Sequence, residues 1–146
     1  MTRHSDEHTI REIIESQLSA LSEKDVKGSI GVYAKGTVMY TLAPPLRSQN
    51  DDEASAAAAV QKWFDTWEGP LEYETRDLAI TVSGDLALST SLRHMMGNQN
   101  GQQVDLWFRK TLGFKRLDGE WKIIHDHESV PFYMDGSMIA AVDLKP

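Results

Sequence analysis

The chain contains no cysteine among its 146 residues. A disulfide framework, a thiol nucleophile and a zinc–thiolate site are therefore excluded, and we expect the fold to depend on its hydrophobic core. The N-terminus has no apolar run of signal-peptide length, and no segment approaches the roughly 18 apolar residues of a membrane span. These absences predict a soluble cytoplasmic protein without a membrane partner.

Basic residues are outnumbered, with 15 Lys and Arg against 22 Asp and Glu and a net charge of -7. Nucleic-acid binding needs clustered Lys and Arg to neutralise phosphates, so this balance argues against such a partner. Any anionic ligand must meet a local positive site. The length and the apolar fraction of 40% are typical of one globular domain. We predict a single domain over residues 1–146, with residues 1–8 flexible and residues 133–146 as a C-terminal extension.

The N-terminal half predicts three helices. Apolar residues recur at helical spacing over residues 10–21. Asp25 stands before residues 26–33, where its side chain can cap a second short helix. A third helix is predicted over residues 53–67 and is ended by Gly69-Pro70.

The rest of the chain predicts strands. A short strand over residues 38–42 is stopped by Pro44-Pro45, and a polar loop follows. Four longer strands, at residues 71–82, 86–96, 104–116 and 120–130, predict an antiparallel meander. The element order indicates an α+β fold with the helices on one face of a curved sheet. Residues 133–146 then extend the last strand or cover an opening.

Several segments resemble one known family: the helix pair with its Asp25 cap, Leu42-Ala-Pro-Pro45, Gly84-Asp-Leu-Ala87, and Asp118-Gly-x-Trp121 followed by His125-x-His127 and Val130-Pro-Phe132. They resemble the SnoaL-like family of the nuclear transport factor 2-like superfamily, which is related to ketosteroid isomerase. The resemblance implies a cone-shaped fold with a pocket between the concave sheet and the helices, and a homodimer formed through the sheet. It implies no single reaction, because the fold serves isomerases, cyclases, hydrolases, dehydratases and association domains.

The register of the last hairpin decides which side chains share a face. A three-residue loop at residues 117–119 places His125 opposite Thr111 and His127 opposite Arg109, whereas a two-residue loop places the histidines beside Leu112 and Lys110. We prefer the first, because it collects aromatic and polar side chains on one pocket wall. The predicted wall contains Trp107, Arg109, Thr111, Trp121, Ile123, His125 and His127. The opposite face is predicted to be an apolar dimer surface of Leu106, Phe108, Leu112, Phe114 and Ile124.

The predicted wall supports acid–base chemistry. We predict His127 as a general base, His125 as its support and Arg109 as the anchor for a carboxylate, phosphate or enolate oxygen. In the alternative, His125 only bonds a neighbouring strand and stiffens the sheet. The further ligand-binding candidates are Trp107, Thr111, Trp121, Tyr40, Asp105 and Arg93.

Two functions remain open at this stage. The first is an isomerase, cyclase or dehydratase acting on a small organic molecule that is anionic or contains a carbonyl, similar to ketosteroid isomerase and without a metal. The second is a non-catalytic ligand-binding or dimeric association domain. His125-x-His127 can supply half a transition-metal site, but spacing fixes no third ligand, so we expect neither a metal nor a cofactor.

Overall fold

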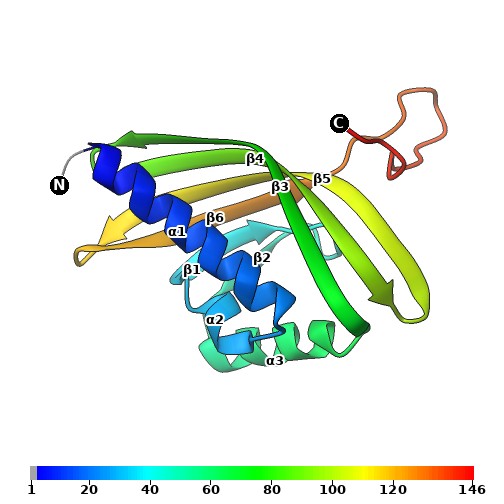
Figure 1. Cartoon of the computed structure of the whole chain (residues 1–146), viewed down its shortest axis with the longest axis horizontal. Helices are drawn as coiled ribbons and strands as arrows, with labels where there is room; N and C mark the ends of the chain where they lie inside the picture. The colour runs from blue at the N-terminus through cyan, green and yellow to red at the C-terminus, as the bar shows by residue number, and fades with distance from the viewer. Residues whose placement is uncertain (1–2) are drawn as a thin grey trace.

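The computed structural model describes residues 3–146, with side chains from Ser5 onward. The helices are α1 (Arg3–Ser22), α2 (Val26–Ile30) and α3 (Glu53–Phe64). The strands are β1 (Tyr33–Tyr40), β2 (Ser48–Asn50), β3 (Trp67–Ser83), β4 (Leu86–Gln99), β5 (Gln102–Leu117) and β6 (Glu120–Ser129). Figure 1 shows α1 lying in front of the long strands, with α2 and α3 near the C-terminal end of α1.

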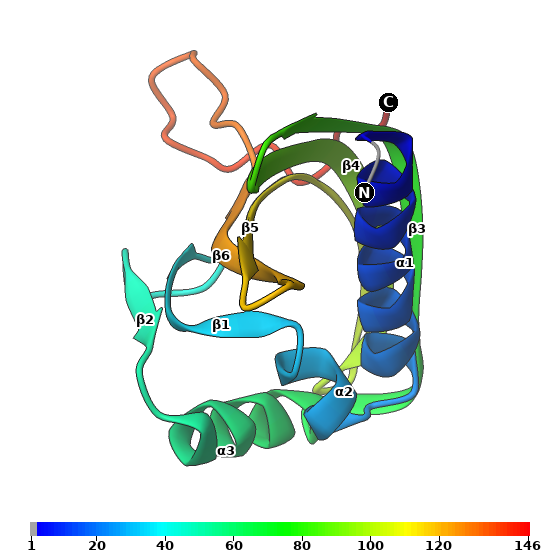
Figure 2. The same cartoon turned by 90° about the vertical axis from the view of Figure 1, so that its left-hand side faces the viewer.

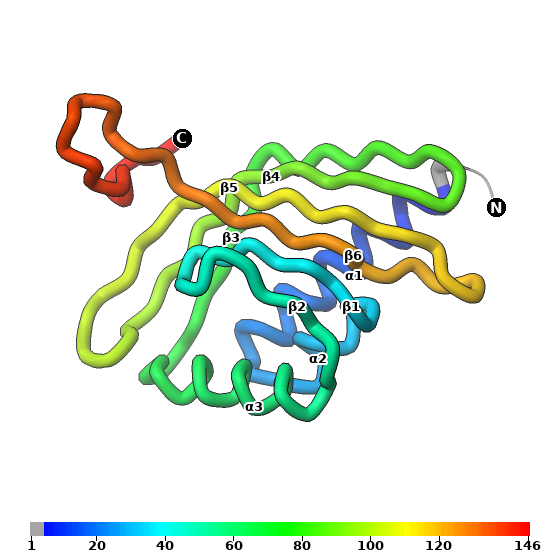
Figure 3. The backbone as a smooth tube through the Cα atoms, turned by 180° about the vertical axis from the view of Figure 1, so that it is seen from behind, coloured from blue at the N-terminus to red at the C-terminus, as the bar shows by residue number. Residues whose placement is uncertain are grey.

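The strands form one sheet in the order β2-β1-β6-β5-β4-β3. Neighbouring strands are antiparallel except for β1 and β6, which are parallel. The sheet curls, and the three helices lie on its open, concave side (Figure 2). Seen from behind, the sheet turns its outer face to the viewer and α1 lies beyond it (Figure 3). The predicted α+β cone with helices on one face is confirmed.

Two irregularities in β3 accompany this curvature. The pairing of β3 with β4 shifts between Glu68 and Leu71 and again between Arg76 and Ala79. Gly69 and Asp77, inside these shifts, adopt φ values of 71° and 58°. Extra residues of this kind bend a strand and increase its twist. Gly69-Pro70 therefore lies inside a strand, and the predicted end of α3 at this dipeptide is wrong, because the helix ends at Phe64.

The helix predictions hold in outline. Asp25 caps α2 by accepting a hydrogen bond from the Gly28 amide at 3.1 Å. The helix predicted over residues 10–21 is longer and includes residues 3–8, which we expected to be flexible, whereas residues 1–2 lie outside the described part of the chain. Asp6 holds this first turn, since both its oxygens accept from Arg116, at 3.1 and 2.9 Å. Strand β2 was not predicted.

The predicted hairpin register is wrong. The loop between β5 and β6 has two residues, Asp118 and Gly119, with φ values of 51° and 81°, as in the type I′ turn that suits tight hairpins. A bulge then inserts one residue between the pairs Phe114–Ile123 and Gly113–His125. Beyond this bulge His127 lies opposite Thr111, and Ser129 lies opposite Arg109.

The bulge reverses the alternation of side chains along β6. Odd-numbered residues face the interior before the bulge and the outer face after it. Trp121 and Ile123 pack in the concave core, whereas His125 and His127 share the outer face with Thr111. The predicted apolar dimer surface is also wrong, because most of its residues lie in the interior and not on the outer face. Leu112 and Phe114 are buried in one hydrophobic cluster with Ile10 and Ile14 of α1. Phe108 is also buried, and Leu106 and Ile124 are half-buried.

The C-terminal extension turns back on itself beyond β6. Phe132 forms a bridge with Ala140, and the Ala141 amide donates to the Pro131 carbonyl at 2.7 Å. At its end the Pro146 carbonyl accepts from Arg76 of β3 at 3.5 Å, so the extension folds back onto the sheet and does not prolong β6. In the described part of the chain no helix combines the length and apolarity that crossing a membrane requires.

Candidate functional site

The concave interior holds two hydrophobic clusters with polar side chains between them. One cluster contains Ile14, Leu112 and Phe114, and the other contains Phe64 and Leu71. Several elements of the fold contribute one or two polar residues to the layer between them. We call this layer the polar belt, and it consists of Gln17, Tyr33, Thr75, Arg93, Lys110, Asp126 and Glu128.

Lys110 is at the centre of the polar belt. Its side chain is 6% exposed, and its ammonium nitrogen lies 2.7 Å from Asp126 Oδ1 and 3.0 Å from Glu128 Oε2. Lys110 on β5 pairs with Glu128 on β6, and Asp126 pairs with Leu112, two residues along from Lys110. The strand pairing therefore brings the three charged side chains together on one face of the sheet. Two carboxylates held by one buried ammonium leave a net negative charge in this triad.

Tyr33 and Gln17 connect the triad to the helices. The Tyr33 hydroxyl donates to Asp126 Oδ2 at 2.6 Å and accepts from Gln17 Nε2 at 2.9 Å. Gln17 Nε2 also lies 3.2 Å from the Ser29 carbonyl of α2. Burial, and then the negative charge of Asp126, raise the pKa of Tyr33 well above its ordinary value. Its hydroxyl therefore remains a donor and fixes the position of the Asp126 carboxylate.

Arg93 is the most unusual member of the polar belt. It is 2% exposed and lies opposite Phe108 on β5 and Thr75 on β3, so it points to the concave side. No residue in the described part of the chain forms a hydrogen bond or ion pair with its guanidinium, and its Nε is buried without a partner. The hydroxyl of Thr75 is also buried and unpartnered. Native proteins rarely leave such groups unsatisfied.

Tyr73 on β3 lies close enough to Glu128 and Arg93, two members of the polar belt, for their charges to act on it. Burial raises the pKa of Tyr73, the negative charge of Glu128 raises it further, and the positive charge of Arg93 opposes them. Its hydroxyl contacts only the sulfur of Met95, at 3.5 Å, among the residues that the structure describes. Glu128 and Arg93 thus act on one interior region.

A groove of about 680 Å³ lies at the end of β1, where the chain enters the loop that follows. It is lined by Tyr40, residues 41–46, His127 and Glu128. The Glu128 side chain is 20% exposed, and its Oε1 has no hydrogen-bond partner in the described chain. Glu128 therefore lines the groove and also belongs to the buried triad.

The predicted residues His125, His127 and Tyr40 meet on the outer face. The Tyr40 ring lies 5.0 Å from the His125 ring and 5.2 Å from the His127 ring, edge to face. His125 Nδ1 lies 2.7 Å from the Val38 carbonyl, which can only accept, so Nδ1 carries a proton. The histidines share a face as predicted, but that face is turned away from the helices.

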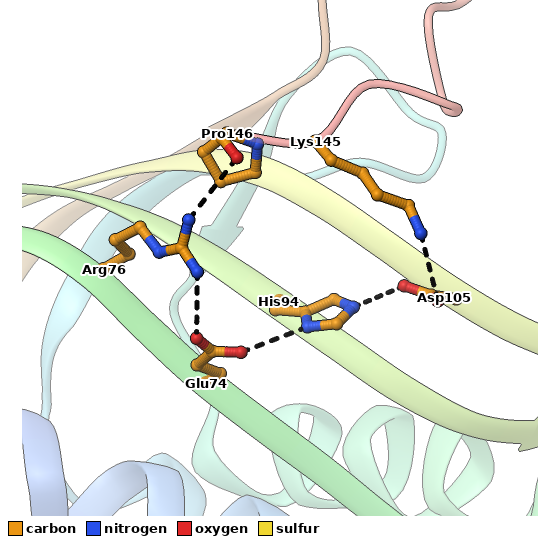
Figure 4. Close-up of polar contacts among 6 residues, drawn as sticks. All are labelled: Glu74, Arg76, His94, Asp105, Lys145 and Pro146. Carbon is orange, nitrogen blue, oxygen red and sulfur yellow. Dashed lines mark hydrogen bonds and ion pairs between the residues drawn. The ribbon is translucent and has the colours of Figure 1, made fainter.

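Asp105 and Trp107 lie further along the outer face, beside the C-terminal extension. His94 stacks on Trp107 with ring centres 4.4 Å apart, and its ring nitrogens face Glu74 and Asp105 (Figure 4). The hydrogen bond from His94 lowers the pKa of Asp105. Lys145 lies 3.9 Å from Asp105. These contacts tie residues of the extension to the sheet.

The remaining predicted residues divide between the faces. Arg109 donates to Ser129 at 3.0 Å, and with Thr111 it lines an open depression of about 290 Å³ on the outer face. Arg93 and Trp121 lie inside, where Trp121 Nε1 donates to Asp6 at 3.3 Å. The residues that we predicted to form one pocket wall therefore lie on both faces of the sheet. No trio of His, Asp or Glu side chains among the described residues is arranged to hold a metal ion.

Sequence reasoning missed Lys110, Asp126, Glu128 and Tyr33. One signal was present. Phe108, Lys110, Leu112 and Phe114 occupy every second position of β5, so the lysine had to share the buried face of the three apolar residues. A charged residue in such a pattern indicates a buried ion pair or a binding site.

Comparisons with known proteins agree with this architecture. A solved NTF2-like protein of unknown function from Pseudomonas putida KT2440 is 29% identical, with all of both chains covered and a TM-score of 0.87. A candidate dehydratase of the NTF2-like family from Streptomyces avermitilis is 15% identical over 88% of this chain and 97% of its own, with a TM-score of 0.75.

A candidate ketosteroid isomerase from Shewanella frigidimarina NCIMB 400 is 24% identical over 81% of this chain and 92% of its own, with a TM-score of 0.65. These last two similarities show the fold alone. No curated protein sequence matches the chain. The profile of the SnoaL-like domain matches residues 10–133, nearly the whole length described above. The chain therefore belongs to the SnoaL-like domain family, with the nuclear transport factor 2-like fold.

Proposed function

We propose that the protein binds a small organic carbonyl compound inside the cone and moves a proton on it, as an isomerase, cyclase or dehydratase would. The observation that carries this proposal is the buried triad of Lys110, Asp126 and Glu128 beside the unpartnered Arg93. Burying charges costs free energy that an apolar core would avoid, so a buried cluster of charged side chains is a candidate functional site.

Glu128 is the proposed base. Glu128 lines the groove and its Oε1 has no hydrogen-bond partner in the described chain, while Lys110 holds Oε2 at 3.0 Å and fixes the carboxylate. Asp126 is less suited to this role, because Lys110 and Tyr33 already bond it and it is 3% exposed. Asp126 and Tyr33 are then positioning residues that hold Lys110 in place.

The proposed step is the transfer of a proton from the carbon next to the carbonyl to Glu128. The electrons of the broken C–H bond form a C=C bond, and the carbonyl π electrons move to oxygen, which gives an enolate. Return of the proton from Glu128 to the same or another carbon regenerates a ketone. Buried cationic groups stabilise the enolate, because they are oriented before charge develops.

The sequence-based proposal remains the competitor. In it His127 is the base, His125 its support and Arg109 the anchor, all on the outer face. One observation favours it, namely that His127 and Tyr40 line the same groove as Glu128. The two proposals assign the proton to neighbouring residues on opposite faces of β6.

The test is exchange of α-protons in D2O, followed by NMR over a panel of cyclic ketones and β,γ-unsaturated ketones. We expect the wild-type protein to accelerate exchange of at least one compound and Glu128→Gln to slow it about 10²- to 10⁴-fold, the usual effect of losing a general base. Glu120→Gln is the matched control, since Glu120 is exposed on the same strand. Acceleration that survives in Glu128→Gln, or none with wild type, contradicts the proposal.

A further inference from the structure

Arg93 is buried in a way that a core alone does not explain. The side chain is 2% exposed, yet its guanidinium has no acceptor among the residues described. A guanidinium offers five donors and no acceptor, so only a hydrogen-bond acceptor, such as a carbonyl oxygen, can satisfy it. The directly opposite residue, Thr75, adds a second buried polar atom without a partner. The two unpartnered side chains therefore lie side by side on the concave face, on neighbouring strands whose paired residues are about 5 Å apart.

The charges of the polar belt restrict what Arg93 can hold. Arg93 and Lys110 are cationic and Asp126 and Glu128 are anionic, so the belt is formally neutral. A carboxylate ligand would add a negative charge to this buried layer, at a cost in free energy. An uncharged carbonyl compound preserves neutrality. Neutrality is also kept after proton transfer, because Glu128 becomes uncharged as the negative charge develops on the ligand oxygen.

We propose that Arg93, assisted by the Thr75 hydroxyl, binds the carbonyl oxygen of an uncharged substrate and stabilises it as an oxyanion. This inference rests on the proposed function and deepens it, by naming the oxygen-binding subsite and the substrate class. Arg93 is then a catalytic residue, since its guanidinium contacts the oxygen on which charge develops. The fork of donors suits this role, as charge-assisted bonds strengthen when the acceptor becomes an anion.

The first test uses 4-nitrophenol, whose visible absorption band reports the phenolate, with nitrobenzene as the matched uncharged ring. We expect the wild-type protein to bind nitrophenol as the phenolate, with the phenol proton passed to Glu128 so that the belt gains no net charge, and to bind nitrobenzene more weakly. Arg93→Met should weaken phenolate binding about ten- to hundredfold, as expected for one charge-assisted hydrogen bond, and leave nitrobenzene binding unchanged. Equal phenolate affinity in Arg93→Met, or no phenolate bound by wild type, overturns the proposal.

Arg93→Lys covers the case in which the methionine variant does not fold. The lysine keeps the charge and loses the fork of donors, so an intermediate loss of phenolate affinity is expected, and wild-type affinity overturns the assignment. Glu128→Gln separates this inference from the proposed function, because it should slow α-proton exchange about 10²- to 10⁴-fold and still bind the phenolate. Phenolate binding that depends on Glu128 and not on Arg93 contradicts the subsite alone.

The second test addresses the substrate class. Acetophenone and benzoate have rings of the same size and differ in charge. We expect acetophenone to raise the melting temperature of the wild-type protein more than benzoate does at neutral pH, because a ligand that binds only the native state stabilises it. A larger shift with benzoate overturns the inference of an uncharged substrate.

Discussion

His127 and Glu128 are neighbours in β6, and their side chains lie on opposite faces of the sheet. Glu128 Oε2 is 3.0 Å from the buried Lys110 ammonium, whereas the His127 ring lies 5.2 Å from that of Tyr40 on the outer face. One strand thus carries a candidate base on each side. We propose that the inner one, Glu128, carries the chemistry.

Lys110→Met tests whether the triad is held by its one cation. Removing the ammonium leaves Asp126 with only the Tyr33 hydroxyl and Glu128 without a partner, and breaking a buried ion pair from one side costs about 3–5 kcal/mol. We expect the free energy of unfolding in urea to fall by about this amount. Lys115→Met, at an exposed position on the same strand, should change it by less than about 0.5 kcal/mol. Similar losses for both variants would show that the triad is not a buried network.

Alkaline titration tests the buried tyrosines. The pKa values of Tyr33 and Tyr73 are raised above 10.0 in the folded protein, first by burial. Above pH 10.0 the unfolded chain loses these protons and the folded chain keeps them, so stability present below that pH declines as the pH rises. Each tyrosine contributes a slope of about 1.4 kcal/mol per pH unit there. Tyr33→Phe and Tyr73→Phe should each reduce the slope, and wild-type slopes would be inconsistent with buried hydroxyls.

Acid titration tests the anchor of α1. The hydrogen bonds from Arg116 are the main cause that lowers the pKa of Asp6 below 3.8. A lowered carboxyl pKa stabilises the fold above the unfolded pKa, and this stability is lost as the pH falls through the folded value. Asp6→Asn should therefore be less stable than wild type at pH 7, with a difference that shrinks below about pH 4. Asp85→Asn, at an exposed partner of Arg116, should have a smaller effect. A difference independent of pH would contradict the ion pair.

Gly97 and Gly113 form a matched pair for testing packing. A Cβ at Gly97 would lie 2.8 Å from the Pro70 carbonyl oxygen and 3.0 Å from the Trp67 ring, whereas at Gly113 the nearest atom is His125 Cβ at 3.5 Å. We expect Gly97→Ala to lower the free energy of unfolding by about 1–3 kcal/mol, as overpacking does. Gly113→Ala should be neutral or stabilising by up to about 1 kcal/mol. A larger loss of stability for Gly113→Ala than for Gly97→Ala would mean that β3 and β4 are not in close contact at Gly97.

The elements of the fold follow from local patterns. The stripe of isoleucines in α1, the Asp25 cap and the four long strands were all predictable, because periodicity and capping act within a few residues. The family resemblance followed from the same segments. Their ends were less predictable, as α3 stops before Trp67 and this residue begins β3.

The face of each side chain could not be predicted from local patterns. Asp118 adopts a left-handed backbone like Gly119, which makes the loop one residue shorter than expected, and a bulge beyond Ile123 shifts the register again. The side on which the sheet curls depends on the packing of α1, far away in the sequence. The histidines therefore remained together while the interior was assigned to the wrong residues.

The most direct measurement is the rate of α-proton exchange for Glu128→Gln and His127→Ala, compared on one responsive ketone at one pH. The variants differ in which face of β6 loses its base, and His127→Ala leaves the Lys110 triad intact. We expect His127→Ala to retain a rate close to wild type, and Glu128→Gln to lose about 10²- to 10⁴-fold. Loss in His127→Ala together with retention in Glu128→Gln would contradict an interior site and assign the chemistry to the outer face.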